Sequence, residues 1–84
     1  MSNADGKNSK WLNRLNNNDL TAFDEIYLES KKSVFYTIYL ITKSVEDTKD
    51  LMQETYLDFL SYFKRLKPDT DVVAFLVTSA KIRL

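Results

Sequence analysis

Apolar residues recur every three or four positions along most of this chain, and polar residues fill the positions between them. This spacing is typical of amphipathic helices, because one turn of an α-helix takes about 3.6 residues. The pattern is interrupted in three places, which divide the chain into four helical segments. The predicted helices are Ser9–Leu15, Leu20–Lys43, Val45–Leu66, and a last one that begins after Thr70 or Asp71 and continues to Leu84.

The residues at the interruptions are ones that begin or end helices. Asp19, Ser44 and either Thr70 or Asp71 precede helical segments, and their side chains can accept hydrogen bonds from a first helical turn. The three Asn residues before Asp19 compete for backbone hydrogen bonds and so end the leading helix. Pro68 cannot continue a helix and closes the third one.

Two segments are rich enough in β-branched or apolar residues to form strands instead, residues 34–42 and residues 72–77. The helical period continues through both of them, so we predict helix in each. The chain is therefore predicted to be an all-α protein, a small bundle of three principal helices plus a short N-terminal helix.

Large side chains on the apolar stripes are the candidate core. The aromatic residues expected there are Phe23, Tyr27, Phe35, Phe59 and Phe63. Trp11, on the leading helix, leaves two alternatives open: it packs across the bundle, or it is exposed.

Composition limits the size and class of the protein. A chain of 84 residues has room for one domain. An apolar content of 44% and an aromatic content of 13% exclude a disordered chain. One Gly and one Pro are fewer than an all-β fold normally needs for its turns.

The start of the chain and its cellular setting also follow from composition. Residues 1–4 resemble the remnant of an expression tag, which leaves residues 5–84 as the domain. No run of about 18 apolar residues occurs, so no membrane insertion is expected. The chain has no Cys, which excludes disulfides and suits the reducing cytoplasm, where we expect it to act.

Charge is balanced overall but unevenly distributed. Residues 1–18 carry a net charge of +2, residues 19–58 of −5, and residues 59–84 of +3. An acidic middle and a basic end indicate two faces with different partners, the alternative being ordinary solvated surface.

Catalytic chemistry lacks its usual residues. Without His or Cys, no imidazole base, thiolate nucleophile or imidazole–metal site can form, and no Gly-rich loop is present to hold phosphate. Asp47, Asp50 and Glu54 lie one turn apart, but no predicted pocket would separate their pKa values. We expect no enzymatic activity, no cofactor and no metal.

Four residues of the third helix form the most informative surface. Asp50, Gln53, Glu54 and Leu57 fall at i, i+3, i+4 and i+7, and therefore share one stripe. A face with acid, amide and leucine side chains can dock a basic helix of another protein. The alternative is that these positions are only polar surface.

Three segments in order resemble a known family. Residues 47–57 read D-T-K-D-L-M-Q-E-T-Y-L and resemble region 2.2 of the sigma-70 family of RNA polymerase sigma factors, extracytoplasmic-function type. Residues 22–27, A-F-D-E-I-Y, resemble the opening of region 2.1. Residues 73–81, V-A-F-L-V-T-S-A-K, resemble region 2.3. The resemblance covers about residues 19–84.

The resemblance implies a sigma factor domain 2 that binds the β′ clamp helices of core RNA polymerase. The residues that match the family's contact are Asp50, Gln53 and Glu54, with Leu57 nearby. In the intact parent such a domain recognises the −10 promoter element and directs transcription initiation. An anti-sigma factor that covers the same surface is a second partner compatible with the resemblance. From another class, the alternative is a helical interaction module that self-associates and has no promoter function.

Basic residues are the candidates for contact with promoter DNA, and they are Lys64, Arg65, Lys67, Lys81 and Arg83. For the first three, the alternative is that they complement the negative end of a helix dipole. The chain departs from the family where Phe75 replaces the usual Trp, and where Val77 and Thr78 occupy positions that often hold an aromatic and a basic residue. Region 2.4 would begin near or beyond Leu84, so we expect a domain truncated before or within that region.

Overall fold

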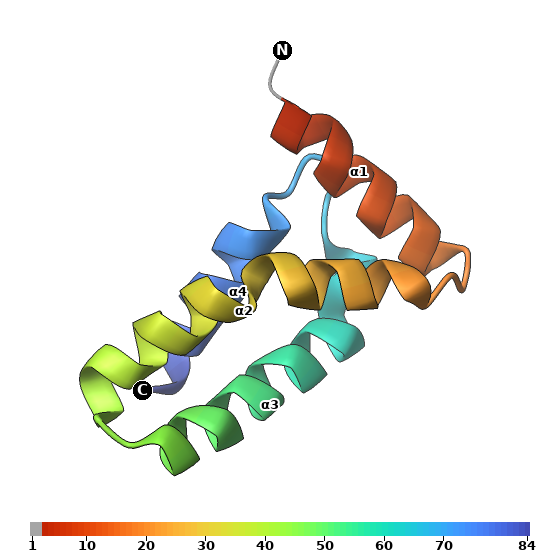
Figure 1. Cartoon of the computed structure of the whole chain (residues 1–84). Coiled ribbons are helices and arrows are strands. Elements are labelled where there is room, and N and C mark those ends of the chain that lie inside the picture. Colours follow the sequence, from red (N-terminus) through yellow and green to blue (C-terminus); the bar gives the residue numbers. More distant parts are fainter. Residues whose placement is uncertain (1–2) are drawn as a thin grey trace.

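Helix α2, Thr21–Thr42, is the central element of the fold and packs against each of the other three α-helices. The computed structural model describes residues 3–84, and the side chains of residues 8–84. Helices α3, Val45–Tyr62, and α4, Val72–Arg83, also pack against each other, so that α2, α3 and α4 form a three-helix bundle (Figure 1). Helix α1, Asn3–Asn16, lies across one end of it. The predicted all-α bundle is confirmed for the described residues.

The leading helix is longer than predicted. It begins at Asn3 instead of Ser9, and so includes two residues that we had assigned to the tag remnant. Residues 3–8 contain no apolar residue larger than Ala, so the apolar period gave no signal for this part of the helix.

The third helix also ends differently from the prediction. Its α-helical part stops at Tyr62, and the chain then tightens into the 3-10 turn η1, Phe63–Arg65, before it becomes extended at Leu66. Such tightening is common where a helix ends, and it leaves Pro68 in the following loop.

At each of the three expected helix starts, a predicted capping side chain accepts a hydrogen bond from the first helical turn. The backbone N–H of Asp47 donates to Ser44 Oγ at 3.2 Å, and that of Ala74 donates to Asp71 Oδ1 at 3.1 Å. Asp71, rather than Thr70, is therefore the cap of α4. Asp19 caps the start of α2, because its Oδ1 accepts a hydrogen bond from the Thr21 N–H at 3.2 Å, with Leu20 between them in a helical conformation.

The core is formed by buried apolar side chains from all four α-helices and η1. Phe59 is fully buried at its centre, with its ring centroid about 6 Å from those of Phe23, Phe63 and Phe75. Trp11 is 3% exposed, so of the two alternatives for this residue, packing across the bundle is the one that the structure shows.

The remaining aromatic predictions differ in outcome. Phe59 and Phe63 are buried, and Phe23 and Phe35 are half-buried against the core. Tyr27 was predicted to be core but is 40% exposed, because it lies at the edge of the stripe that α2 buries and packs only one side of its ring on Tyr56.

Candidate partner-binding surface on α3

The four residues predicted to contact a partner lie together on the outer face of α3. Asp50, Gln53, Glu54 and Leu57 are all exposed, and at about 100° per residue they fall within about 100° of helical arc. The opposite face of α3 is buried, with Thr48, Met52, Thr55, Tyr56 and Phe59 turned into the bundle. Because this inner face is held by packing, the outer face is a rigid surface. Leu57 is an apolar side chain 56% exposed among polar neighbours.

An arginine from α4 reaches this surface from one side. The guanidinium Nη1 of Arg83 lies 3.2 Å from Glu54 Oε2, and its Nη2 pairs with Asp58 Oδ2. Arg83 was predicted to contact DNA, and Asp58 was not singled out at all. No signal in the sequence links these residues, because they lie on different helices and meet only through the packing of α3 on α4.

The Arg83 contact changes the charge that the surface presents. One guanidinium faces two carboxylates, so part of the negative charge at Glu54 is already compensated within the chain. Asp50 makes no ion pair among the described residues, and its charge is open to solvent. The negative charge of this face therefore comes mainly from Asp50 and from the part of the charge on Glu54 and Asp58 that Arg83 does not compensate.

On the other side, the surface borders a hollow between α3 and α2. Gln53 and Leu57 line this hollow of about 440 Å³ together with Phe23, Tyr56 and Leu60. The sequence gave no indication of it, because a hollow between helices depends on how they cross. The polar face and an apolar depression are thus continuous through Gln53 and Leu57.

The basic residues predicted to bind DNA do not form one stripe. Lys64, Arg65 and Lys67 are exposed in and after η1, where the Arg65 guanidinium lies 5.5 Å from the centre of the Tyr62 ring. Lys81 is exposed in the last turn of α4, and Arg83 is engaged with α3. The position of Lys64 and Arg65 directly after α3 also fits the helix-dipole alternative.

The positions that depart from the family pattern are mostly packed. The ring of Phe75 stacks on Tyr62 at 5.9 Å and contacts Phe59, so its faces are covered by this chain. Val77 is half-buried, and Thr78 is exposed.

A separate charged cluster joins α1 to α2. Arg14 pairs with Asp19 Oδ2 at 2.8 Å and with Glu25 Oε2 at 2.7 Å. Hydrogen bonds from Thr21 and Arg14 hold the pKa of Asp19 below its ordinary value. Hydrogen bonds, first from Arg14 and also from Trp11, lower the pKa of Glu25. The cluster is explained as a structural link between the two helices.

Within residues 3–84, no group of three or more acidic side chains is placed to hold a metal ion. None of the described helices is long and apolar enough to cross a membrane. Comparison of the chain with protein-family models, with curated proteins and with solved structures finds no match.

Proposed function

We propose that this chain acts as domain 2 of a sigma factor, a non-catalytic module that binds the β′ clamp helices of core RNA polymerase in the bacterial cytoplasm. The observation that carries the proposal is the shared outer face of α3, where Asp50, Gln53, Glu54 and Leu57 are exposed side by side. The ordered resemblance of three segments to regions 2.1, 2.2 and 2.3 supports the same assignment.

The chemistry of this face suits a basic partner helix. Asp50 and Glu54 offer carboxylates to Arg or Lys side chains, and the Gln53 amide can both donate and accept hydrogen bonds. Leu57 supplies an apolar contact that loses water on binding. Charge complementarity of this kind fixes orientation and speeds association more than it raises affinity.

In the intact parent, the same domain would direct recognition of the −10 promoter element. The exposed Lys64, Arg65, Lys67 and Lys81 can contact phosphates, which gives weak and salt-sensitive binding without sequence preference. Arg83 would contribute to DNA binding only after leaving Glu54 and Asp58.

The direct test is binding of the chain to an isolated β′ clamp-helix subdomain, measured by calorimetry. Glu54→Lys reverses the central charge, and we expect it to weaken binding by about tenfold or more. Asp24→Lys is the matched control, because Asp24 is an exposed acid on α2 and the change in net charge is the same.

Circular dichroism would establish that both variants keep the helical content of the parent chain. Equal affinity of Glu54→Lys and Asp24→Lys, or no binding by the folded parent chain, would contradict the proposal. Co-purification with a small regulator instead of polymerase would favour an anti-sigma factor on this surface.

A second candidate is a helical module that self-associates, and exposed apolar side chains favour it. The most exposed are Leu20, Leu28, Tyr36, Leu40, Ile41 and Ile82. Exposed apolar area of this extent often marks an interaction surface. Sedimentation equilibrium separates the candidates: a concentration-dependent dimer without affinity for the clamp helices supports self-association.

A further inference from the structure

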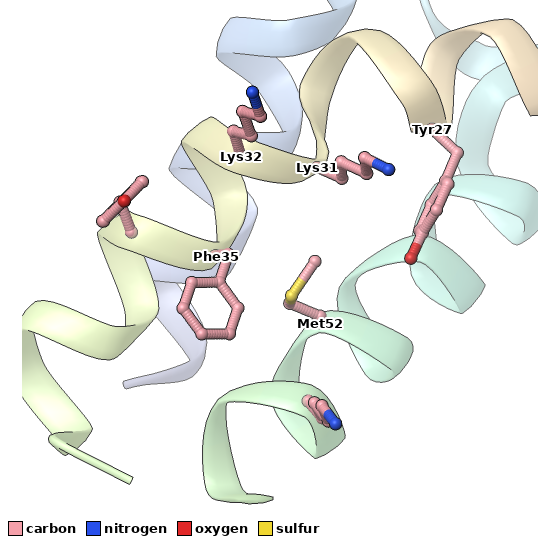
Figure 2. A pocket seen from close by; sticks show the side chains of 7 residues that line it. Tyr27, Lys31, Lys32, Phe35 and Met52 are labelled. Carbon is pink, nitrogen blue, oxygen red and sulfur yellow. The ribbon is translucent and has the colours of Figure 1, made fainter. Parts of the chain in front are cut away.

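A groove runs between α2 and α3 on the side of the bundle away from Arg83. It consists of two adjoining hollows of about 430 and 440 Å³, which share Tyr27, Lys49 and Met52 in their walls. Figure 2 shows Phe35 of α2 and Met52 of α3 facing each other across the first hollow, with Tyr27 further along the groove. The floor is therefore apolar and partly aromatic.

The rim of the first hollow is basic. Lys31 and Lys32 of α2 and Lys49 of α3 line it, and Figure 2 shows Lys31 extending toward Tyr27. No Asp or Glu lines either hollow. None of the three lysines makes an ion pair within the described part of the chain. The other side of α3 is acidic, with Glu54 and Asp58 only partly compensated by Arg83.

The length of the groove suits a short helix. Its α3 wall extends from Lys49 to Leu60, which at about 1.5 Å per residue is about 16 Å. A helix of about 11 or 12 residues, three turns, covers that distance and presents one apolar side chain per turn. Tyr36 also lines the first hollow and is mostly exposed.

We propose that this groove binds an acidic amphipathic helix of a partner protein. Apolar residues of that helix, spaced at i, i+4 and i+7, lie on Phe35, Met52 and Tyr27. Its Asp or Glu residues flank the apolar stripe and face Lys31, Lys32 and Lys49. The proposal differs from the polymerase contact in the charge of the partner, since the groove's basic rim and the acidic face of α3 require partners of opposite charge, although Gln53 and Leu57 belong to both surfaces.

The aromatic rings of the groove fit a protein partner better than single-stranded nucleic acid. Base stacking needs ring faces that are free. The Phe35 ring stacks on Tyr39, with centroids 5.6 Å apart and planes 12° apart, and the Tyr27 ring packs on Tyr56 at 5.1 Å. These rings offer edges and partial faces, which pack well against aliphatic side chains.

The test uses a fluorescein-labelled peptide of about 12 residues that carries Leu at the three spaced positions and Glu on both flanks. Fluorescence anisotropy measures its binding to the intact chain. We expect saturable binding that weakens by about tenfold in Lys31→Glu/Lys49→Glu. Lys10→Glu/Lys81→Glu, with the same change of charge, should retain the affinity of the parent chain, because both lysines are exposed and lie outside the groove. A peptide of the same composition with its Leu residues scattered should not bind.

Each other outcome overturns the proposal. No binding of the acidic peptide by the folded chain, or equal binding of the scattered peptide, would remove the groove as a helix site. Tighter binding of a labelled oligo-dT, lost in the same double variant, would assign the groove to nucleic acid. A dimer that is abolished by Tyr36→Ser, a change at an exposed position of the groove, would assign it to a second copy. Charge reversal at Glu54 should leave the peptide in place, which separates this test from that of the polymerase contact.

Discussion

Polar and apolar side chains are buried together at one end of the bundle, whereas at the other end apolar side chains remain exposed. At the first, the tethered end, α1 lies beside the loop that leads into α4 (Figure 1). There the Val72 N–H donates to Asn8 Oδ1 at 3.0 Å, and Ser9 Oγ donates to the Pro68 carbonyl at 2.8 Å. At the second, the open end, α2 turns into α3, and Leu40, Ile41 and Val45 are all exposed.

The contrast separates an end that is linked by long-range hydrogen bonds from an end that exposes apolar side chains. The Asn8 side chain satisfies the buried N–H of Val72, and the exposed bond from Ser9 to the Pro68 carbonyl adds a second link between α1 and the segment that leads into α4. The turn between α2 and α3 is held by local bonds, such as Thr42 to Thr48 and the Lys43 N–H to Tyr39 O. Its apolar surface is left available, as surfaces for partners commonly are.

The largest expected effect comes from the same substitution made at each end. Leu15 is 1% exposed and Leu40 is 63% exposed. Leu15→Ala should lower the free energy of unfolding by about 2–5 kcal/mol, because it leaves a cavity in the core. Leu40→Ala should change it by no more than about 0.5 kcal/mol. Urea unfolding followed by circular dichroism measures both, and similar losses would remove the distinction between the ends.

A smaller effect is expected from the cap that α1 provides to α4. Asn8→Ala leaves the buried Val72 N–H without its acceptor, which should cost about 1–3 kcal/mol. Asn8→Asp keeps an oxygen there and places a negative charge at the N-terminus of α4, where it is favoured. Thermal unfolding should therefore show a lower melting temperature for Asn8→Ala and a melting temperature close to that of the parent chain for Asn8→Asp. Equal losses would mean that the hydrogen bond is not what holds this end.

Acid should weaken the tethered end through the link between α1 and α2. The pKa values of Asp19 and Glu25 are lowered in the folded chain, so both carboxylates bind protons more readily when it unfolds. Their contribution to stability is fully present above the ordinary pKa values of about 4. It is lost as the pH falls through the lowered pKa values of the folded chain. Arg14→Gln should flatten this part of the pH dependence of the melting temperature. Lys10→Gln, with the same change of charge on α1, should not.

Helices with apolar stripes and capping residues could be predicted from the sequence, since both signals are local. Ser44 and Asp71 precede helices and cap them as expected. The start of α1 could not be predicted, because its residues carry no apolar period and Asn8 finds its partner 64 positions away. Tyr27 was misplaced because a stripe on a helical wheel does not show where the neighbouring helix stops covering it.

For the candidate site, the shared face of Asp50, Gln53, Glu54 and Leu57 followed from spacing on one helix. The two features beside it did not. The Arg83 contact and the groove both depend on the crossing of helices, which the sequence pattern does not specify. The contacts between helices were therefore the part of the candidate site that could not be predicted from the sequence.

The smallest effect on stability is expected from Arg83→Ala, and it is informative for that reason. The Glu54 and Asp58 carboxylates are exposed although the Arg83 side chain is only 25% exposed, and the Arg83 Nε is buried without a hydrogen-bond partner, so the net contribution of the ion pairs should be about 0–1 kcal/mol. The variant also frees Glu54 from an internal competitor. If a basic helix binds the outer face of α3, its affinity should rise several-fold, by about 1 kcal/mol or less. Calorimetry with the clamp-helix subdomain measures this change, and Arg65→Ala is the control because Arg65 makes no ion pair with a described residue. A fall in affinity would instead mean that Arg83 orders the carboxylates for the partner, and the α4 side of the surface would then belong to the binding site.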